Sequence, residues 1–296
     1  MINICEVGPR DGLQNEKEIV STADKVELIN RLIKAGIKKI EAVSFVNPKV
    51  VPQMADAEQV MNSIPSHPEV SYSGLVLSRK GLDRALNTKI DTVNVVLAVS
   101  EQFNLKNARR SVKQSQEELV EVILETERAG RKPAGVLGTV FGCPYEGSVS
   151  IDKVFSIANS FIEAGCKEIV LADTTGMANP LQVKQVTESF VKAFGEEIEL
   201  RLHFHNTRGL GLANTLAAYQ AGVQSFDSSI AGLGGCPFAP KAVGNVCTED
   251  MVNMFHRMSA DTNLNLEELI KTSHWIENII GRPLPGMVSK ADCVKV

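Results

Sequence analysis

Short apolar runs alternate with amphipathic segments along most of the chain. Eight of these runs are rich in Val, Ile and Leu, a composition typical of strands that are covered on both faces. The amphipathic segments between them place apolar residues at helical spacing, which favours helices packed on a sheet. The predicted strands span residues 2–7, 38–45, 69–77, 91–98, 133–141, 168–173, 199–205 and 225–231.

The predicted helices end at glycines, where a chain commonly leaves a helix. The segment after the first strand begins with Ser21 as a candidate N-cap and ends at Gly36, and similar segments end at Gly130, Gly165 and Gly222. A repeated strand–helix–glycine unit predicts an α/β fold of the (β/α)8 TIM-barrel type, for which roughly 250 residues are typical. An open doubly wound sheet is the main alternative, but no G-x-G-x-x-G follows the first strand.

Two more helices are predicted after the eighth strand, over residues 248–258 and 265–281. Residues 282–296 then form a tail with two prolines. No linker, low-complexity stretch or block of charge divides the chain. We therefore predict a single TIM-barrel catalytic domain over residues 1–296, with additional C-terminal helices in an extension that starts at about residue 248.

The amino-acid composition limits the kinds of molecule that we expect the protein to bind. The 296 residues are 44% hydrophobic and 22% charged, with a formal net charge of −4. This balance argues against nucleic acid or a membrane surface as the main partner. The apolar runs fall far short of the ~20 residues that a membrane helix needs. Because the first strand follows Met1 directly, we expect a cytoplasmic protein without a targeting segment.

The six cysteines form no C-x-x-C pair, and a chain of this length does not need disulfides, so we expect reduced thiols. Cys5 and Cys166 lie in apolar runs and are expected in the core. Cys143, Cys236 and Cys247 lie in predicted loops and are open to other roles.

Unusual polar residues follow several predicted strands, and the carboxyl ends of barrel strands form the mouth where this fold places its chemistry. Arg10, Asp11 and Gln14 come after the first strand. Glu41 lies within the second strand, where a buried carboxylate must be paired or functional. Asp173 ends the sixth. Each also has an ordinary structural alternative, such as a solvated turn, an ion pair or a helix cap.

The sharpest chemical signal is the pair His203 and His205 on the seventh strand. Residues two apart leave the same face of a strand, so both imidazoles can reach one cation. Asp11 and Asn245 could supply oxygens to the same cation. A set of nitrogen and oxygen donors without thiolates suits Mg²⁺ or Mn²⁺ with waters, or a catalytic Zn²⁺, better than a structural zinc.

Residues 232–250, GLGGCPFAPKAVGNVCTED, follow the eighth strand and so lie over the same mouth. Glycines allow sharp turns and close approach of the backbone to a ligand. Asn245 could then reach the cation, and Cys236 the substrate. By itself the stretch is equally consistent with a plain loop and an inert thiol. The polar residues at four other strand ends favour the functional interpretation.

Several motifs together closely resemble those of the 3-hydroxy-3-methylglutaryl-CoA (HMG-CoA) lyases, which belong to a metal-dependent barrel family that also includes isopropylmalate and homocitrate synthases. The resemblance runs from about residue 2 to residue 293. The loop with Gly-Cys-Pro is its most specific part, because the condensing relatives lack that cysteine arrangement. The motifs are EVGPRDGLQNE, SFVNPKVVPQM, GCPYEG, HFHNTRG, LANTLAA and GLGGCPFAPKAVGNVCTED.

The resemblance implies divalent-cation-dependent cleavage of (S)-HMG-CoA to acetyl-CoA and acetoacetate, as in leucine degradation. It implies that Arg10 contacts the substrate and stabilises enolate charge, and that Cys236 is catalytic. Glu41 and Asp173 match acids that support the site, and we expect both to be catalytic. We also expect Gln14 to bind the substrate and the chain to form a homodimer or a higher homo-oligomer. The implied ligands of Mg²⁺ or Mn²⁺ are Asp11, His203, His205 and Asn245.

The implied reaction develops negative charge on an alcohol and then on an enolate. A divalent cation makes the alcohol easier to deprotonate, and Arg10 can hold the thioester oxygen. The base for the hydroxyl proton is open between Glu41, Asp173 and a water on the cation. Cys236 would deliver a proton to the enolate carbon or shield it from water.

Two alternatives to the lyase reaction belong to other classes. One is a Claisen-type condensing enzyme of the isopropylmalate or homocitrate synthase type, which would use the same barrel and cation but should not need Cys236. The other is a catalytically silent CoA-binding barrel, which would require a missing ligand or acid, and the sequence shows none missing.

Overall fold

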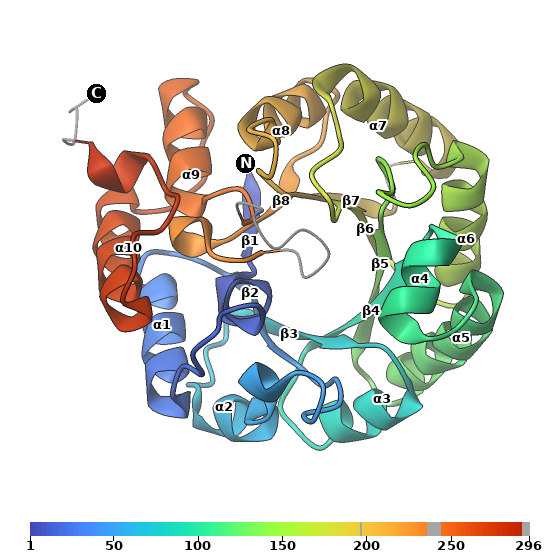
Figure 1. Cartoon of the computed structure of the whole chain (residues 1–296), viewed down its shortest axis with the longest axis horizontal. Helices are drawn as coiled ribbons and strands as arrows, with labels where there is room; N and C mark the ends of the chain where they lie inside the picture. The colour runs from blue at the N-terminus through green and yellow to red at the C-terminus, as the bar shows by residue number, and fades with distance from the viewer. Residues whose placement is uncertain (196, 236–243, 292–296) are drawn as a thin grey trace.

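In the computed structural model, eight parallel strands form a closed barrel in chain order, with helices around it (Figure 1). The structure describes residues 1–195, 197–235 and 244–291. The strands are β1 (Asn3–Glu6), β2 (Lys39–Ser44), β3 (Ser71–Val76), β4 (Thr92–Ala98), β5 (Lys132–Gly138), β6 (Glu168–Asp173), β7 (Glu199–Phe204) and β8 (Ser225–Ser228). β8 closes the ring on β1, where Asn3 pairs with Ser225 and Glu6 with Ser228. The predicted TIM barrel is confirmed.

All eight predicted strands are present, but six end earlier than predicted, and β5 and β8 do so by three residues. β5 ends at Gly138 because the next residue, Thr139, adopts a left-handed conformation with φ 59°. β8 ends at Ser228, and a short 3-10 turn follows in which Ala231 has φ 57°. A strand cannot continue through such backbone angles. The residue type alone does not predict a left-handed conformation at a threonine or an alanine.

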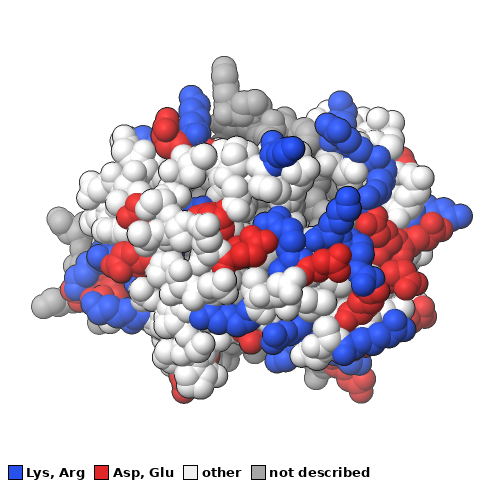
Figure 2. Space-filling model, turned by 90° about the horizontal axis from the view of Figure 1, so that it is seen from below, with Lys and Arg blue, Asp and Glu red and all other residues white. Residues whose placement is uncertain are grey.

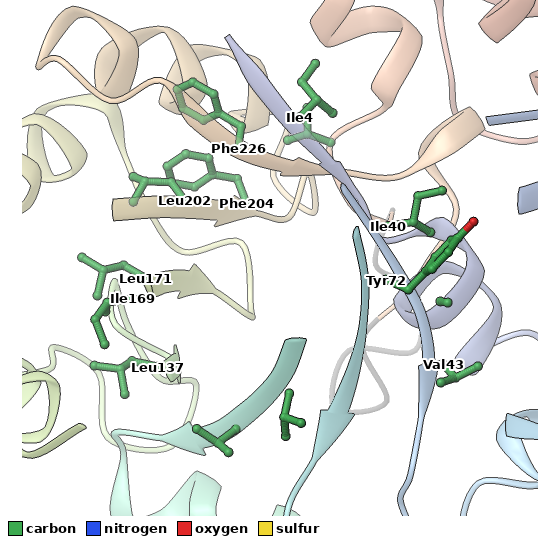
Figure 3. Packing of buried hydrophobic residues seen from close by; sticks show 14 of the residues in the cluster. Ile4, Ile40, Val43, Tyr72, Leu137, Ile169, Leu171, Leu202, Phe204 and Phe226 are labelled. Atoms are coloured by element: carbon green, nitrogen blue, oxygen red, sulfur yellow. The ribbon is translucent and has the colours of Figure 1, made fainter. Parts of the chain in front are cut away.

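The alternation of side chains along each strand separates an apolar outer surface from a polar interior. Ile40, Leu202 and Phe226 point away from the barrel centre and belong to the main hydrophobic core (Figure 3). Glu41 and Arg201, their neighbours in sequence, line a cavity inside the barrel. The outer layer therefore packs against the helices, and the interior is free to carry charge.

The helices between the strands cover the outside of the barrel (Figure 1). They are α1 (Thr22–Lys34), α2 (Ala57–Ser63), α3 (Arg79–Leu86), α4 (Glu101–Ala108), α5 (Val112–Arg128), α6 (Ile151–Glu163), α7 (Pro180–Phe194) and α8 (Gly211–Gln220). Ser21 caps α1 by accepting the N–H of Asp24 at 3.1 Å, as predicted. Gly36, Gly165 and Gly222 follow helices at φ 100°, 126° and 99°, which confirms their predicted role in ending them.

Two additional helices follow the barrel, as predicted. They are α9 (Thr248–Arg257) and α10 (Leu266–Ile280). α10 packs against α1 and α9, and the three lie on one side of the barrel (Figure 1, left).

Basic and acidic side chains are interspersed on the face shown in Figure 2. Within the described residues, no helix combines the length and the apolar character that crossing a bilayer would require.

Candidate active site and metal centre

A tight turn directly after β1 carries Arg10 and Asp11. It is the π-helical turn η1 (Gly8–Gly12), a rare conformation that occurs frequently at functional sites. A Cβ at Gly8 would lie 2.6 Å from the carboxylate of Glu6, so the turn needs glycine at its start. The sequence Gly-Pro-Arg-Asp-Gly therefore forms a compact turn that places the side chains of Arg10 and Asp11 at the barrel mouth.

Asp11, His203 and His205 form a cluster at this mouth. One possible ligand atom from each residue lies within 4.8 Å of those of the other two. His203 lies in β7 and His205 directly after it, so the alternation of the strand turns both imidazoles to the same side. His205 Nε2 lies 3.9 Å from Asp11 Oδ2. The three groups are close enough to hold one metal ion.

Asn245 joins this cluster from the segment that follows β8. It forms an isolated antiparallel bridge with His205, and its Nδ2 donates to Asp11 Oδ2 at 2.7 Å. Asn245 Oδ1 and His205 Nδ1 are buried and have no hydrogen-bond partner among the described residues. Buried polar atoms are rarely left unpaired. A carboxylate, two imidazoles and a free amide oxygen fit a divalent cation.

Electrostatics set two of these groups in the protonation state that metal binding requires. Burial favours a higher pKa for Asp11, but Arg10, His203 and His205 outweigh it and lower that pKa to about 2. Burial and the charge of His203 lower the pKa of His205 to about 4. At neutral pH Asp11 is therefore ionised and His205 is neutral, as metal ligands must be.

Arg10 connects the cluster to an acid on β2. Its guanidinium pairs with Asp11 and Glu41, and its Nε donates to Glu41 Oε2 at 2.6 Å. Asn94 Nδ2 donates to the other oxygen of Glu41 at 2.7 Å. Burial works against the charge of Arg10, but the two carboxylates raise its pKa above the ordinary value. Arg10 is thus a fixed cation beside the cluster.

These residues surround a cavity of about 100 Å³ inside the barrel mouth. Arg10, Asp11 and Glu41 form one charged side, and Val96 and Val136 contribute apolar surface from β4 and β5. The cavity therefore places charged groups next to apolar surface.

Asp173 is buried but does not line this cavity. Its Oδ1 accepts the N–H of Met177 at 2.8 Å and closes the turn between β6 and α7, while Oδ2 has no partner among the described residues. Burial raises the pKa of Asp173 to about 6. Gln14 also lies outside the cavity lining, just after η1, and its Oε1 is buried without a partner in the part of the chain that the structure describes.

Four of the six cysteines are buried, and Cys236 and Cys293 lie outside the described residues. Cys5 and Cys166 are buried, as predicted, and so are Cys143 and Cys247, which the sequence had left open. Ser100 Oγ donates to Cys143 Sγ at 2.9 Å, and burial raises the pKa of the Cys247 thiol well above its ordinary value. Cys143 and Cys247 are structural thiols.

The sequence analysis missed two charged residues below the cluster. Asp227 Oδ2 lies 3.1 Å from His203 Nδ1, and Asp227 Oδ1 accepts a hydrogen bond from Arg201 at 2.8 Å. The available signal was their position at the inward-facing parity of a strand: Arg201 lies between Leu200 and Leu202 in β7, and Asp227 follows Phe226 in β8.

Glu6, at the end of β1, connects the segments around the barrel mouth through its carboxylate. Its Oε1 accepts the N–H groups of Gly8 at 2.7 Å and Ile230 at 2.9 Å, and its Oε2 accepts the hydroxyl of Thr248 at 2.6 Å. Burial raises the pKa of Glu6 from an ordinary 4.5 to about 7. One carboxylate thereby ties together η1, the turn after β8 and the start of α9.

Fold and site together define the class: a (β/α)8 barrel whose mouth holds an Asp-His-His cluster suited to a divalent cation, next to a buried arginine. Comparison with known proteins gives the family. The HMGL-like family model matches residues 1–276, and the chain belongs to that family.

Individual relatives agree with this assignment over nearly their whole length. The chain is 43% identical to a hydroxymethylglutaryl-CoA lyase of Bacillus subtilis, covering 96% of this chain and 95% of the relative. It is 40% identical to an (R)-citramalyl-CoA lyase of Chloroflexus aurantiacus, covering 98% and 94%. Among solved structures, an HMG-CoA lyase of Acinetobacter baumannii in complex with coenzyme A and 3-methylmalate superposes with a TM-score of 0.95 at 42% identity, covering 100% and 98%. The two curated relatives are both named as lyases of acyl-CoA thioesters, and their names differ in the acyl group.

Proposed function

We propose that this protein cleaves (S)-3-hydroxy-3-methylglutaryl-CoA to acetyl-CoA and acetoacetate with Mg²⁺ or Mn²⁺, the reaction of leucine degradation. The observation that carries the proposal is the cluster of Asp11, His203 and His205 beside Arg10. Membership of the HMGL-like family and the 43% identical lyase support it.

In the proposed reaction, different residues at the barrel mouth stabilise the charge on the alcohol and the charge on the thioester oxygen. A divalent cation held by Asp11, His203, His205 and Asn245 would favour loss of the proton from the substrate alcohol. Arg10 stays protonated and can hold the thioester oxygen as negative charge develops there. Glu41 keeps the guanidinium in place through the 2.6 Å contact to its Nε.

Glu41 and Asp173 differ as acceptors of the alcohol proton. Both oxygens of Glu41 are engaged, one by Arg10 and one by Asn94. Asp173 has one oxygen without a partner among the described residues and a pKa raised to about 6 by burial, close to the pH at which a base is effective. We therefore assign Glu41 to holding Arg10, and the base stays open between Asp173, which lies outside the cavity lining, and a water on the cation.

Cys236 is the proposed acid that protonates the enolate carbon. Replacing it with alanine should remove most cleavage while the protein still binds Mn²⁺, because none of the proposed ligands is altered. Cys247→Ala is the matched control, since this thiol is buried and structural, and it should keep its turnover. Full activity in Cys236→Ala would remove the thiol from the mechanism.

A larger cavity of about 730 Å³ beside the mouth is the proposed place for the CoA moiety. Lys17, Arg282 and Lys290 line it together with Gly235 and Gly244, which flank residues 236–243 in the chain. Glu16 and Glu18 also line this cavity, and Arg282 pairs with Glu16. Lys17 and Lys290 are the proposed partners of the CoA phosphates. Lys17→Gln should raise the KM for the thioester with little change in kcat.

The acyl group is the finer question, because the 40% identical relative is named for citramalyl-CoA. That thioester is one methylene shorter than HMG-CoA, a difference that pockets discriminate by about 10–200-fold. We expect kcat/KM to favour HMG-CoA. The deciding experiment incubates the purified enzyme with each thioester and Mg²⁺ or Mn²⁺, and measures acetoacetate and pyruvate with and without chelator.

The same assay separates the other classes. A condensing enzyme would consume acetyl-CoA and a keto acid instead of releasing a ketone, and a silent CoA-binding barrel would show no turnover after metal loading. We further propose that the enzyme acts in the cytoplasm as a homodimer or higher homo-oligomer, which light scattering of the purified protein would measure.

A further inference from the structure

A row of ion pairs runs along three neighbouring strands, β6, β7 and β8, below the cation cluster. Arg201 Nε lies 2.8 Å from Glu168 Oε1 on β6, and the same guanidinium donates to Asp227 Oδ1 on β8 at 2.8 Å. Arg201 is 3% exposed and Asp227 is 7% exposed. Buried charges are costly to desolvate and are often no more stabilising than apolar side chains of similar volume. Stability alone therefore explains this row poorly.

The row ends on one imidazole of the cluster. Asp227 Oδ2 lies 3.1 Å from His203 Nδ1. The contact is built into the sheet, because His203 on β7 and Asp227 on β8 are register partners in the parallel ladder. Since Arg201 holds the other carboxylate oxygen, Asp227 cannot turn away from the ring without breaking a second buried pair.

Hydrogen bonding at Nδ1 determines what the other ring nitrogen can do. An ionised carboxylate only accepts hydrogen bonds, so His203 Nδ1 is the nitrogen that donates to it, and in the neutral ring the lone pair then lies on Nε2. His205 is different, because its Nδ1 has no partner among the described residues. Carboxylates that orient a ligand imidazole in this way commonly strengthen metal binding.

We propose that Asp227, held by Arg201, is a positioning residue that fixes the tautomer and the ring orientation of His203, so that Nε2 is presented to the cation. The inference rests on the proposed cation function. Asp227 itself makes no bond to the cation in this scheme and acts only through His203.

The test combines metal affinity with a direct measure of the tautomer. Wild-type protein, Asp227→Leu and Asp227→Asn are titrated with Mn²⁺ and followed by electron paramagnetic resonance. In parallel, ¹⁵N-histidine NMR of the metal-free proteins at pH 8.5 reports which nitrogen of His203 carries hydrogen, with His203→Gln used to assign the signal. Asp250→Asn is the matched control: Asp250 is 8% exposed and accepts the N–H of Val288 at 2.7 Å in the C-terminal segment.

We expect Asp227→Leu to weaken Mn²⁺ binding by about 10–100-fold and to shift His203 towards the Nε2-protonated tautomer. Asp227→Asn keeps an acceptor oxygen beside Nδ1 and should retain the tautomer with an intermediate loss of affinity. Asp250→Asn should leave both measurements unchanged even where the melting temperature falls.

Asp227→Leu protein with wild-type affinity and an Nδ1-protonated His203 would overturn the inference. If Asp227→Leu fails to fold, Asp227→Asn decides: a protein that binds Mn²⁺ more weakly and keeps an Nδ1-protonated His203 supports the inference, and an unchanged affinity, or a wild-type His203 that is protonated at Nε2, overturns it. Failure of the proposed cation function would give a different result, because wild-type protein would then bind no Mn²⁺. A change of the His203 tautomer between wild type and Asp227→Leu would still show that Asp227 fixes the tautomer of this ring.

Discussion

At the scale of single residues, charge pairing decides what each group at the mouth can do. Arg10 lies between Asp11 and Glu41, and this position lowers the pKa of Asp11 and keeps the guanidinium charged. Asp173 has no such cation in contact among the described residues, and burial raises its pKa instead. Two carboxyl groups near one barrel mouth thus have opposite pKa shifts: the pKa of Asp11 is lowered, and that of Asp173 is raised.

Arg10→Gln tests this division. We expect kcat to fall by about 10³-fold, because the positioned donor that matches developing charge is lost. The affinity for Mn²⁺ should change little, since all four proposed ligands remain. The measurements are steady-state kinetics and a Mn²⁺ titration of the same preparation.

The control for Arg10→Gln is Arg79→Gln, which removes an exposed arginine paired with Asp83 and Glu125. Exposed ion pairs contribute little, so kcat should stay at the wild-type value. A mild loss of kcat in Arg10→Gln, comparable with that of Arg79→Gln, would exclude Arg10 from the chemistry.

At the scale of elements, the mouth is assembled from turns rather than from strands alone. η1 carries Arg10 and Asp11, and the turn after β8 and the start of α9 fix its position through Glu6. The three contacts to Glu6 come from segments at opposite ends of the chain. The protonation of this one carboxyl group therefore bears on how firmly the elements hold together.

The raised pKa of Glu6 predicts a definite pH dependence of stability. The folded protein holds this proton more tightly than the unfolded chain, so the stabilisation is complete below pH 4.5 and is lost as the pH rises to about 7. Glu6→Gln should remove that loss, because an uncharged amide can still accept the two N–H groups through its oxygen and can donate to the Thr248 hydroxyl through its NH2 group. Relative to wild type, the variant should gain up to about 3 kcal/mol between pH 5 and pH 8, measured by denaturant unfolding.

Glu188→Gln, a surface acid paired with Lys184 on α7, is the control and should show no such trend. Parallel pH profiles for wild type and Glu6→Gln would show that Glu6 titrates at its ordinary value in the folded protein.

At the scale of the whole molecule, the candidate site exists only because the barrel closes. Asp11 comes from the beginning of the chain, the two histidines from β7 and Asn245 from the segment after β8. β8 pairs with both β1 and β7, and this brings the three segments together. A cation at the site would therefore link distant parts of the chain and stabilise the fold as a unit.

Metal binding should consequently raise the melting temperature. At a Mn²⁺ concentration of 100 times Kd the stabilisation is about 2.7 kcal/mol, which corresponds to roughly 5 °C. Calorimetry with Mn²⁺ and then with chelator would measure the shift and its reversal. His203→Ala and His205→Ala should lose the shift and should contain less metal by elemental analysis. An equal shift in these variants would place the cation elsewhere.

The difference between prediction and structure lies in particular residues. The strands and the helix ends followed from the sequence because periodicity and glycine positions are local signals, as at Ser21 and Gly36. The early ends of β5 and β8 did not, because left-handed backbone at Thr139 and Ala231 depends on tertiary packing. Cys143 and Cys247 were left open for the same reason: burial is a property of the folded chain.

The sequence by itself determined the barrel and the shared face of His203 and His205, because a strand turns alternate residues to the same side whatever surrounds it. Only the tertiary structure decided which acids reach those imidazoles. Asp11 approaches His205 across the mouth, and Asp227 meets His203 from the neighbouring strand. These contacts join residues far apart in the chain, and they are set by barrel closure and strand register, which no local pattern encodes.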